Sequence, residues 1–308
     1  MKIIILLATI CIGIQSKSIA QPYKISNDVE RIVFLGNSIT YQGIYIEFID
    51  AYYTLHYPEK TYEFLNVGLP SETVSGLSEP NHAKGKFPRP VLRERLTRVL
   101  AATNPDLVFS CYGMNDGIYM PFDEERFQKY KDGIHWLNEE IEKAGAEIIH
   151  ITPPIYDERK GAAYANVLDI YSDWLISNRY INGWRVIDIH WPMRKALEDY
   201  RAADSTFVFA NDGIHPSVQG HFEMAKFILR SLEEPAMAEF DDPEAYFSTL
   251  QNGKQILSLV QSRQKLSKDA WLTHTGHKRP NMKKGLPLDE AQEKMIEIEQ
   301  QIKMLIAK

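Results

Sequence analysis

The sequence predicts an α/β fold in which helices cover both faces of a parallel β-sheet. Short, almost continuously apolar runs alternate along the chain with longer segments in which apolar residues recur every three or four positions. Near-continuous apolar strands are typical of a parallel sheet that is buried on both faces. Ligands of such sheets bind beyond the carboxyl ends of the strands. Polar residues that directly follow a strand are therefore the candidate functional residues.

Five strands and several helices follow from this pattern. The strands are expected at residues 31–35, 62–67, 106–111, 147–151 and 184–189. Helical spacing of apolar residues is found at 91–100, 127–141 and 217–232. Each predicted helix lies between strands or after the last one. Strand and helix thus alternate as repeated β-α-β units.

The chain changes character near residue 240. Residues 233–242 are rich in acidic residues and proline, and beyond them only helical patterns occur, at 251–266 and 289–307. The sequence therefore predicts a single α/β domain over residues 21–240 and a helical C-terminal extension over residues 241–308, which agrees with about 150 residues per domain.

The first 20 residues have the pattern of a signal peptide. Lys2 precedes an apolar run of about a dozen residues, which is shorter than the roughly 20 residues of a membrane span. Small residues, Ser18 and Ala20, stand before the expected cleavage site. Cys11 lies inside the apolar run and follows Ile10, where a lipid-attachment signal would have a small residue. We therefore expect an exported protein, periplasmic or secreted, that begins at Gln21, carries no lipid anchor and is not stably inserted in a membrane.

The composition limits which kinds of molecule this protein is expected to bind. The net charge is −6 and no dense basic run occurs, which argues against a nucleic-acid partner. Cys111 is the only cysteine after residue 20, so no disulfide can form within residues 21–308. The expected partner is a small-molecule or polysaccharide substrate, and nothing in the sequence indicates the oligomeric state.

A candidate nucleophile follows the first predicted strand. In the segment Gly36-Asn37-Ser38, the hydroxyl of Ser38 would stand at the carboxyl end of that strand, where a helix begins. A lone Gly-Asn-Ser is more often an ordinary turn in which the serine caps a helix. The segment also lacks the second glycine of the Gly-x-Ser-x-Gly elbow, which argues against the common α/β-hydrolase arrangement.

A candidate base and its acid stand together near the end of the domain. Asp212 precedes His215 by three residues, and Gly213 allows a tight bend between them. Serine is a poor nucleophile unless a histidine accepts its proton, and a carboxylate holds that histidine in the correct tautomer. The alternative is a plain Asp-Gly turn that His215 caps. Asp116 and Asp188 are further acids that could orient His215, although spacing favours Asp212.

Two further turns could supply hydrogen-bond donors for an oxyanion, each donor contributing about 10²–10³ in rate. Gly68 ends the second predicted strand and could offer its backbone N–H. Asn115 follows the third predicted strand and could offer its side-chain amide. Taken singly, both segments also read as ordinary turns.

The order of these blocks resembles the SGNH hydrolase superfamily of GDSL-like esterases, in an exported bacterial form with a C-terminal helical extension. The resemblance covers about residues 30–232. It implies a flavodoxin-like three-layer α/β/α sandwich around a five-stranded parallel sheet, a serine esterase activity, and no cofactor or metal. By position, Ser38, Asp212 and His215 resemble the catalytic residues, while Gly68 and Asn115 resemble the oxyanion donors together with the N–H of Ser38.

One position departs from this pattern and one property is left open. The first block of the superfamily usually reads Gly-Asp-Ser, and Asn37 here replaces the acid but keeps the ability to accept hydrogen bonds in a turn. The substrate favoured by the resemblance is an O-acetyl ester of a carbohydrate. A lipase, thioesterase or aryl-esterase of the same fold is one alternative, and a carbohydrate-binding protein with a vestigial site is another.

The remaining cysteine, histidine, tryptophan and basic residues that could serve a site are interpreted as structural residues. Cys111 at the end of a predicted strand is more often a small buried apolar residue than a nucleophile. His274 and His277 lack a nearby cysteine or carboxylate, so no metal is expected. The mixture of Trp271, Lys278 and Arg279 is more often an interface between an extension and its domain, with substrate binding as the alternative.

Overall fold

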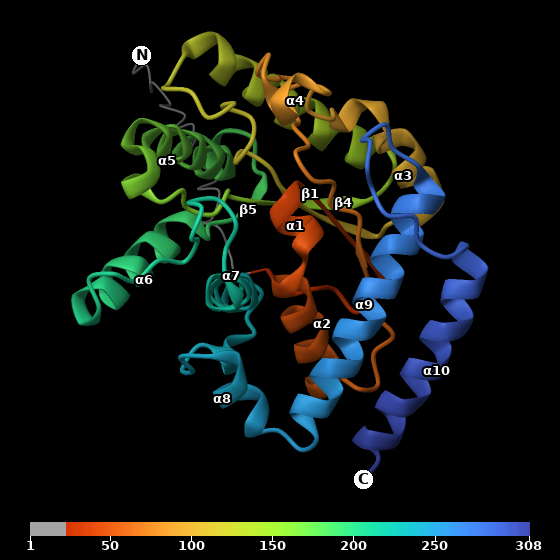
Figure 1. Cartoon of the computed structure of the whole chain (residues 1–308). Coiled ribbons are helices and arrows are strands. Elements are labelled where there is room, and N and C mark those ends of the chain that lie inside the picture. The colour runs from red at the N-terminus through yellow and green to blue at the C-terminus, as the bar shows by residue number, and fades with distance from the viewer. Residues whose placement is uncertain (1–22) are drawn as a thin grey trace, which may run out of the picture.

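The computed structural model describes residues 23–308 and contains a five-stranded parallel sheet (Figure 1). The predicted signal peptide lies outside the described residues. The strands are β1 (Arg31–Gly36), β2 (Glu63–Asn66), β3 (Leu107–Cys111), β4 (Glu147–Ile151) and β5 (Arg185–Ile187). Their order in the sheet is β2-β1-β3-β4-β5, which is the flavodoxin-like order. The predicted fold class and all five strands are confirmed.

Ten α-helices and three 3₁₀ helices surround this sheet in the described part of the chain. The α-helices are α1 (Ser38–Gln42), α2 (Ile44–His56), α3 (Leu96–Thr103), α4 (Glu124–Lys143), α5 (Glu158–Ile181), α6 (His190–Ala203), α7 (Val218–Ser231), α8 (Pro243–Ser248), α9 (Gly253–Thr275) and α10 (Leu288–Ile306). The 3₁₀ helices are η1 (His82–Gly85), η2 (Leu92–Glu94) and η3 (Pro235–Met237). None of the described helices combines the length and the apolar character that a membrane crossing requires.

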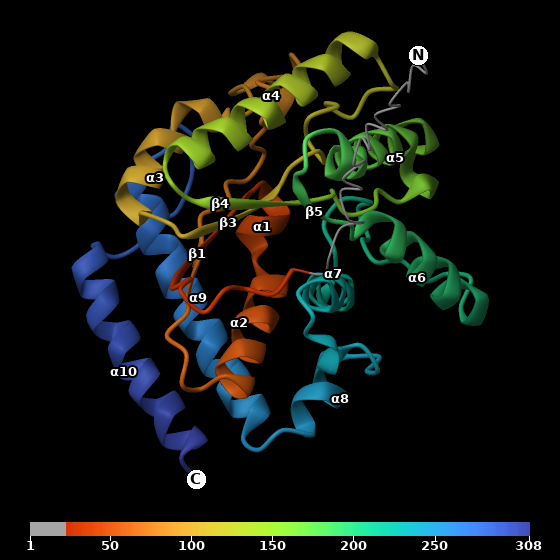
Figure 2. The same cartoon turned by 180° about the vertical axis from the view of Figure 1, so that it is seen from behind.

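The helices form layers on the two faces of the sheet. Helices α3, α4 and α5 lie on one face, and α2, α7 and α9 lie on the other (Figures 1 and 2). Every residue of β3 is buried. This agrees with the prediction, from the continuous apolar runs, of a sheet that is covered on both faces. The three-layer arrangement therefore follows from the sequence pattern.

The register of the sheet brings the ends of β1 and β3 together. Gly36, the last residue of β1, pairs with Cys111, the last residue of β3. The segments that follow these strands therefore leave the same edge of the sheet side by side. They carry Ser38 and Asn115.

The C-terminal extension packs directly on the sheet domain. Helix α9 lies against α2 and β2, and α10 lies against α9 (Figure 1). The side-chain amide of Gln264, buried in this interface, donates to Asp50 at 2.7 Å and to the carbonyl of Phe64 at 2.9 Å. Because Phe64 lies in the edge strand β2, α9 satisfies part of an edge that would otherwise be open. The division at residue 240 stays a prediction.

Helix α9 is longer than predicted. The sequence indicated a helix to residue 266, whereas α9 continues to Thr275 and ends at Gly276, which has a φ of 70°. The additional turns bury Ala270, Trp271 and Leu272. Tertiary burial thus sustains a part of the helix that its own spacing did not indicate.

Candidate active site

Local structure presents Ser38 at the start of α1. Asn37 caps this helix, and its Oδ1 accepts a hydrogen bond from the N–H of Ile39 at 3.1 Å. Ser38 is the first helical residue and does not serve as the cap. A Cβ at Gly36 would lie 2.2 Å from the Oγ1 of Thr40, so only glycine fits before this turn. Capping by Asn37 leaves the Ser38 hydroxyl free for another partner.

That partner is His215. The Nε2 of His215 lies 2.8 Å from the Oγ of Ser38, and its Nδ1 lies 2.7 Å from the Oδ2 of Asp212. Because the carboxylate accepts the proton on Nδ1, Nε2 is left as the acceptor for the serine hydroxyl. The three predicted residues are therefore joined in one chain of hydrogen bonds.

The Asp212 carboxylate is held by its own loop. Its Oδ1 accepts from the N–H of Ile214 at 2.9 Å and of His215 at 2.8 Å, and Gly213 supplies the bend with a φ of 83°. Partial burial would raise the pKa of Asp212, but the hydrogen bonds from His215 and from these two N–H groups outweigh it and hold that pKa below its ordinary value. The His215 side chain is 43 % exposed, so a substrate and water can reach it.

The other two acids bind elsewhere. Asp116 is buried and accepts hydrogen bonds from the N–H groups of Val74, Ser75 and Gly113, each at 2.9 Å. Asp188 accepts from the hydroxyl of Thr152 at 3.1 Å. Neither carboxylate contacts His215, and both instead fix loops at the carboxyl edge of the sheet.

Gly68 occupies a tight position with its N–H already bonded. The N–H donates to the Oδ1 of Asn66 at 2.9 Å. A Cβ at Gly68 would lie 2.4 Å from the backbone nitrogen of Tyr41, so glycine is required for α1 to pack on the end of β2. The observed role of Gly68 is this close approach, and its assignment as an oxyanion donor stays a prediction.

Asn115 is oriented by two neighbours. Its Oδ1 accepts from the hydroxyl of Tyr119 at 2.9 Å, and its Nδ2 donates to the carbonyl of Glu72 at 3.1 Å. Since a primary amide carries two N–H donors, one hydrogen of Nδ2 remains available. Asn115 can thus present a single aligned donor, as the prediction requires.

The turn at residues 69–72 is a feature that the sequence analysis missed. The N–H of Glu72 donates to the carbonyl of Leu69 at 3.1 Å, and Ser71 has a φ of 68°. Pro70 and Ser71 thus hold the two central positions of a turn in which the second residue takes a left-handed conformation, as in type II. The N–H of Ser71 donates to no other residue of 23–308, and the carbonyl of its neighbour Glu72 accepts from Asn115. Ser71 is therefore a further candidate donor to an oxyanion. The signal in the sequence is Pro70, because proline favours the first central position of such a turn.

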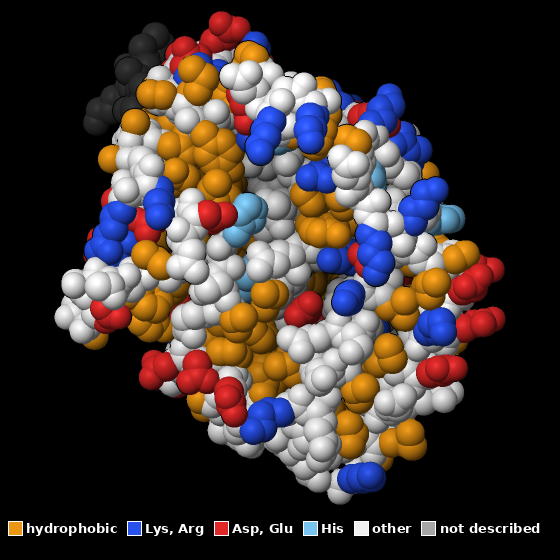
Figure 3. Space-filling model, viewed as in Figure 1, with side chains coloured by type: hydrophobic (Ala, Val, Ile, Leu, Met, Phe, Trp, Pro, Cys, Tyr) orange, Lys and Arg blue, Asp and Glu red, His pale blue; other side chains and the backbone are white. Residues whose placement is uncertain are grey.

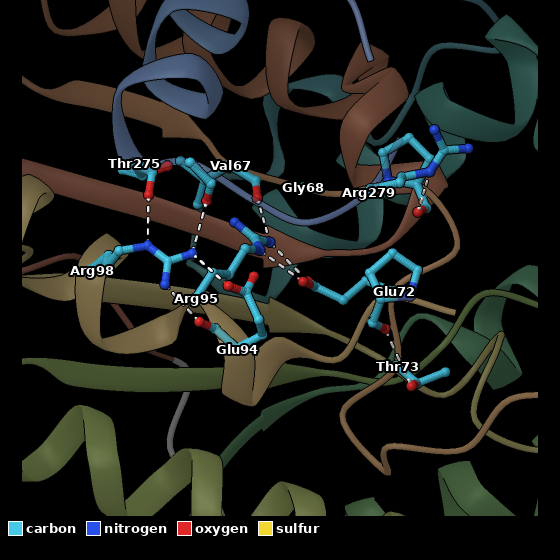
Figure 4. A network of polar contacts seen from close by, with 12 residues as sticks. Val67, Gly68, Glu72, Thr73, Glu94, Arg95, Arg98, Thr275 and Arg279 are labelled. Carbon is cyan, nitrogen blue, oxygen red and sulfur yellow. Dashed lines mark hydrogen bonds and ion pairs between the residues drawn. The ribbon is translucent and has the colours of Figure 1, made fainter. Parts of the chain in front are cut away.

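A buried ion pair supports this turn (Figure 4). Arg95 Nε and Nη2 each donate to the Glu72 carboxylate at 2.7 Å, and Nη2 also donates to the carbonyl of Val67 at 2.8 Å. The hydroxyl of Tyr112 donates to the same carboxylate at 2.7 Å. Both charged side chains are fully buried. The network joins the segments after β2 and β3 and so holds the turn beside Asn115.

The remaining reactive residues take no part in this chain of hydrogen bonds. Burial raises the pKa of the Cys111 thiol to about 12, which disfavours the nucleophilic thiolate. Within residues 23–308, no group of three or more His, Cys, Asp or Glu side chains is arranged to hold a metal ion, and this holds for His274 and His277.

Known structures share this fold. BT4096, a gut microbial diltiazem-metabolizing enzyme, is 23 % identical with a TM-score of 0.57, over 69 % of this chain and 49 % of that one. The chain therefore spans about half the length of that protein. Axe2, an acetylxylan esterase from Geobacillus stearothermophilus, is 22 % identical with a TM-score of 0.53, over 69 % of this chain and 96 % of Axe2. No curated protein sequence matches significantly.

Comparison with protein-family models identifies the family of this chain. The model of the GDSL-like Lipase/Acylhydrolase family matches residues 34–221, which is more than half of the chain and includes Ser38, Asp212 and His215. The chain therefore belongs to the GDSL-like lipase/acylhydrolase family of the SGNH superfamily and is a hydrolase of ester bonds.

Proposed function

We propose that this hydrolase removes O-acetyl groups from carbohydrates through an acyl-enzyme formed on Ser38. The observation that carries the proposal is the unbroken hydrogen-bonded chain from Ser38 through His215 to Asp212. Catalytic mutants of Axe2 replace a serine, an aspartate or a histidine, and the last two are three residues apart, as Asp212 and His215 are. This parallel supports the assignment of roles.

The proposed reaction moves one proton through His215. Its Nε2 takes the Ser38 hydroxyl proton while Oγ bonds to the ester carbonyl carbon, and the same proton then passes to the sugar oxygen as the ester bond breaks. The product of this half is acetyl-Ser38 and a free sugar hydroxyl. Water, deprotonated by Nε2 of His215, then attacks the acetyl carbonyl carbon. The bond from that carbon to Ser38 Oγ breaks, the proton passes from Nε2 to Oγ, and acetate is released with the free serine.

The negative charge on the carbonyl oxygen needs donors. The N–H of Ser38, the free Nδ2 hydrogen of Asn115 and the N–H of Ser71 are the donors that the described residues leave available near this edge of the sheet. Removal of a single such donor costs about 10²–10³ in kcat. We assign the oxyanion to this set rather than to Gly68, whose N–H is bonded to Asn66.

The surroundings support a polar substrate. The ring of Tyr119 lies 5.2 Å from the Arg89 guanidinium carbon, and its hydroxyl donates to Asn115 at 2.9 Å. The ring of Tyr156 lies beside Gly213 in the turn between Asp212 and His215, where an added Cβ would be 3.5 Å from it. Aromatic faces next to charged donors suit a sugar ring. We also propose that the protein is exported, on the signal-peptide pattern of residues 1–20.

A release screen tests this function. Purified protein of residues 21–308 is assayed for acetate release from acetylated glycans and for hydrolysis of p-nitrophenyl esters of increasing chain length. We expect glycan deacetylation and a preference for acetyl over long acyl esters. A preference for long chains would support the lipase alternative. No release from any ester would support a vestigial binding protein.

The nucleophile is tested separately. Ser38→Ala should lower kcat by a factor on the order of 10⁴ or more, with an unchanged melting temperature. A fluorophosphonate probe should label one peptide, the one that contains Ser38, and should not label the variant. Full activity of Ser38→Ala would refute the assignment and leave the enzyme class intact.

A further inference from the structure

The segment that joins α9 to α10 reaches the edge of the sheet where Ser38 lies. Arg98 of α3 donates from Nε to the carbonyl of Thr275 at 3.0 Å, which fixes the end of α9. Four residues later, Arg279 donates from Nε to the carbonyl of Pro70 at 2.9 Å (Figure 4). The C-terminal extension is thus bonded directly to the turn that carries Ser71 and contacts Asn115 through Glu72.

The guanidinium of Arg279 is oriented but its charge is not neutralised. Its Nη1 donates to the carbonyl of Pro280 and to the Sδ of Met282, both at 3.2 Å. Its Nη2 has no partner in the described part of the chain, and no carboxylate there forms an ion pair with it. Partial burial lowers the pKa of Arg279, so the guanidinium has lost some solvent without gaining a counter-ion. A partly desolvated guanidinium interacts more strongly with an anion than a fully solvated one does.

Arg279 also lies within electrostatic reach of α1. Its positive charge opposes the rise in the pKa of the Tyr41 phenol that burial and Asp269 cause. Tyr41 stands one helical turn after Ser38. The guanidinium thus lies between the turn at Pro70, which its Nε contacts, and the ring of Phe87, whose centre is 5.5 Å from its Cζ.

A recess of about 600 Å³ lies between α1, α2 and α9, and Tyr41, which is within electrostatic reach of Arg279, forms part of its wall. Its cations are Lys265, Lys268 and Lys283, and its acids are Glu47 and Asp269. Lys268 donates to the carbonyl of Tyr41 at 2.9 Å and lies 3.9 Å from the centre of its ring.

Neither Lys265 nor Lys283 has an ion-pair partner among residues 23–308. Figure 3 shows Lys and Arg side chains gathered over the upper part of α9 and the segment after it, beside a hollow in the centre of this face. The chain as a whole carries a net charge of −6. A local excess of cations on an acidic protein favours an anionic ligand.

We infer that Arg279, with the lysines of this recess, binds an anionic group of the carbohydrate, a carboxylate or a sulfate, so that the preferred substrate is an O-acetylated acidic glycan. A planar guanidinium with a free edge suits the oxygens of either group. The inference rests on the proposed esterase function. It also gives the C-terminal extension a role in specificity.

Substrate charge and one pair of variants test the inference. Initial rates are measured on chemically acetylated oligogalacturonate, on acetylated sulfated galactan oligosaccharides and on acetylated xylo-oligosaccharides, with p-nitrophenyl acetate as a small neutral ester. Arg279→Gln is compared with Lys278→Gln, because Lys278 is 83 % exposed and lies 3.8 Å from Glu94, away from the recess. Arg279→Lys keeps the charge without the planar fork.

We expect a lower KM for at least one of the two acidic glycans than for the neutral one. Arg279→Gln should raise that KM roughly tenfold or more, as the loss of a hydrogen bond to a charged group implies, and should raise it by a larger factor than the KM for the neutral glycan. Arg279→Lys should recover part of the effect, and Lys278→Gln should leave it unchanged. Unacetylated oligogalacturonate should inhibit p-nitrophenyl acetate hydrolysis competitively, and 0.5 M salt should weaken the inhibition, as charge screening requires.

Failures of the two proposals are distinguishable. Hydrolysis of p-nitrophenyl acetate with equal KM for acidic and neutral glycans would overturn the inference and leave the esterase intact. An equal rise in KM for the neutral glycan in Arg279→Gln would also overturn it, because the residue would then only support the wall of the site. Absence of hydrolysis of every ester would refute the proposed function and this inference with it.

Discussion

The buried pair of Glu72 and Arg95 gives the sharpest test of how the site is held. Glu72→Gln keeps the shape of the side chain but removes the charge, leaving the Arg95 guanidinium buried beside a neutral amide. Two hydrogen bonds of 2.7 Å join the side chains, and neither side chain is exposed. Breaking a buried pair on one side costs about 3–5 kcal/mol, because the remaining charge is uncompensated.

That loss is a large fraction of the stability of a domain, which is about 5–15 kcal/mol. We expect a fall in melting temperature of about 10 °C, at roughly 2–4 °C per kcal/mol for a domain of this size. Activity should fall through kcat more than through KM, because the backbone carbonyl of Glu72 positions Asn115. Urea unfolding and p-nitrophenyl acetate kinetics measure the two effects.

Two controls isolate the cause. Glu63→Gln makes the same change in the Arg31–Glu63 pair, whose side chains are 36 % and 39 % exposed, and should cost at most about 1 kcal/mol. The double variant Glu72→Met/Arg95→Met removes both charges and should recover much of the stability that Glu72→Gln loses. If Glu72→Gln unfolds within about 1 kcal/mol of the parent, the claim that this pair is buried and coupled is wrong.

Three further predictions concern the helix cap, the acid and pH. Asn37→Ala should cost about 1 kcal/mol by removing the α1 cap, whereas Asn37→Asp should not; equal urea midpoints would contradict this. Asp212→Asn should lower kcat on p-nitrophenyl acetate by on the order of 10⁴ because the amide no longer fixes the tautomer of His215; a rate within tenfold of the parent would point to another acid. Burial lowers the pKa values of His150 and His221 to about 3, against about 6.5 when unfolded. Below pH 6.5 the unfolded chain therefore binds more protons than the folded chain. The free energy of unfolding is unaffected by these two groups well above pH 6.5 and declines as the pH falls toward 3. Between pH 7 and 5.5 each group lowers it by about 1 kcal/mol. His221→Phe should reduce this slope in urea melts, and an unchanged slope would refute the contribution of His221.

Much of the fold could be predicted because its pattern is local. Continuous apolar runs identify strands buried on both faces, and β1 and β4 lie within one residue of the predicted bounds. Ser38, Asp212 and His215 could be proposed because each stands at or after a strand end or in the last turn before α7. Asp212 and His215 also lie within one tight turn, so their contact needs almost no knowledge of the fold.

Other features depend on neighbours that are distant in the sequence. Gly68 looked like a free donor, but the Asn66 side chain uses its N–H and α1 packs against its Cα. Ser71 could not be predicted as a donor, because its left-handed conformation depends on a turn that the Arg95 guanidinium supports through Glu72. Arg95 lies in a different part of the chain.

The class of fold, the block order of the family and the three residues of the hydrogen-bonded chain could be predicted from the sequence alone, because apolar periodicity and short turns are properties of adjacent residues. Which donors remain free, which charges are paired and where the C-terminal extension lies depend on contacts between residues that are distant in the sequence. Arg279 shows why: its identity is visible in the sequence, but whether a guanidinium has a counter-ion depends on which side chains the fold brings within a few ångströms of it.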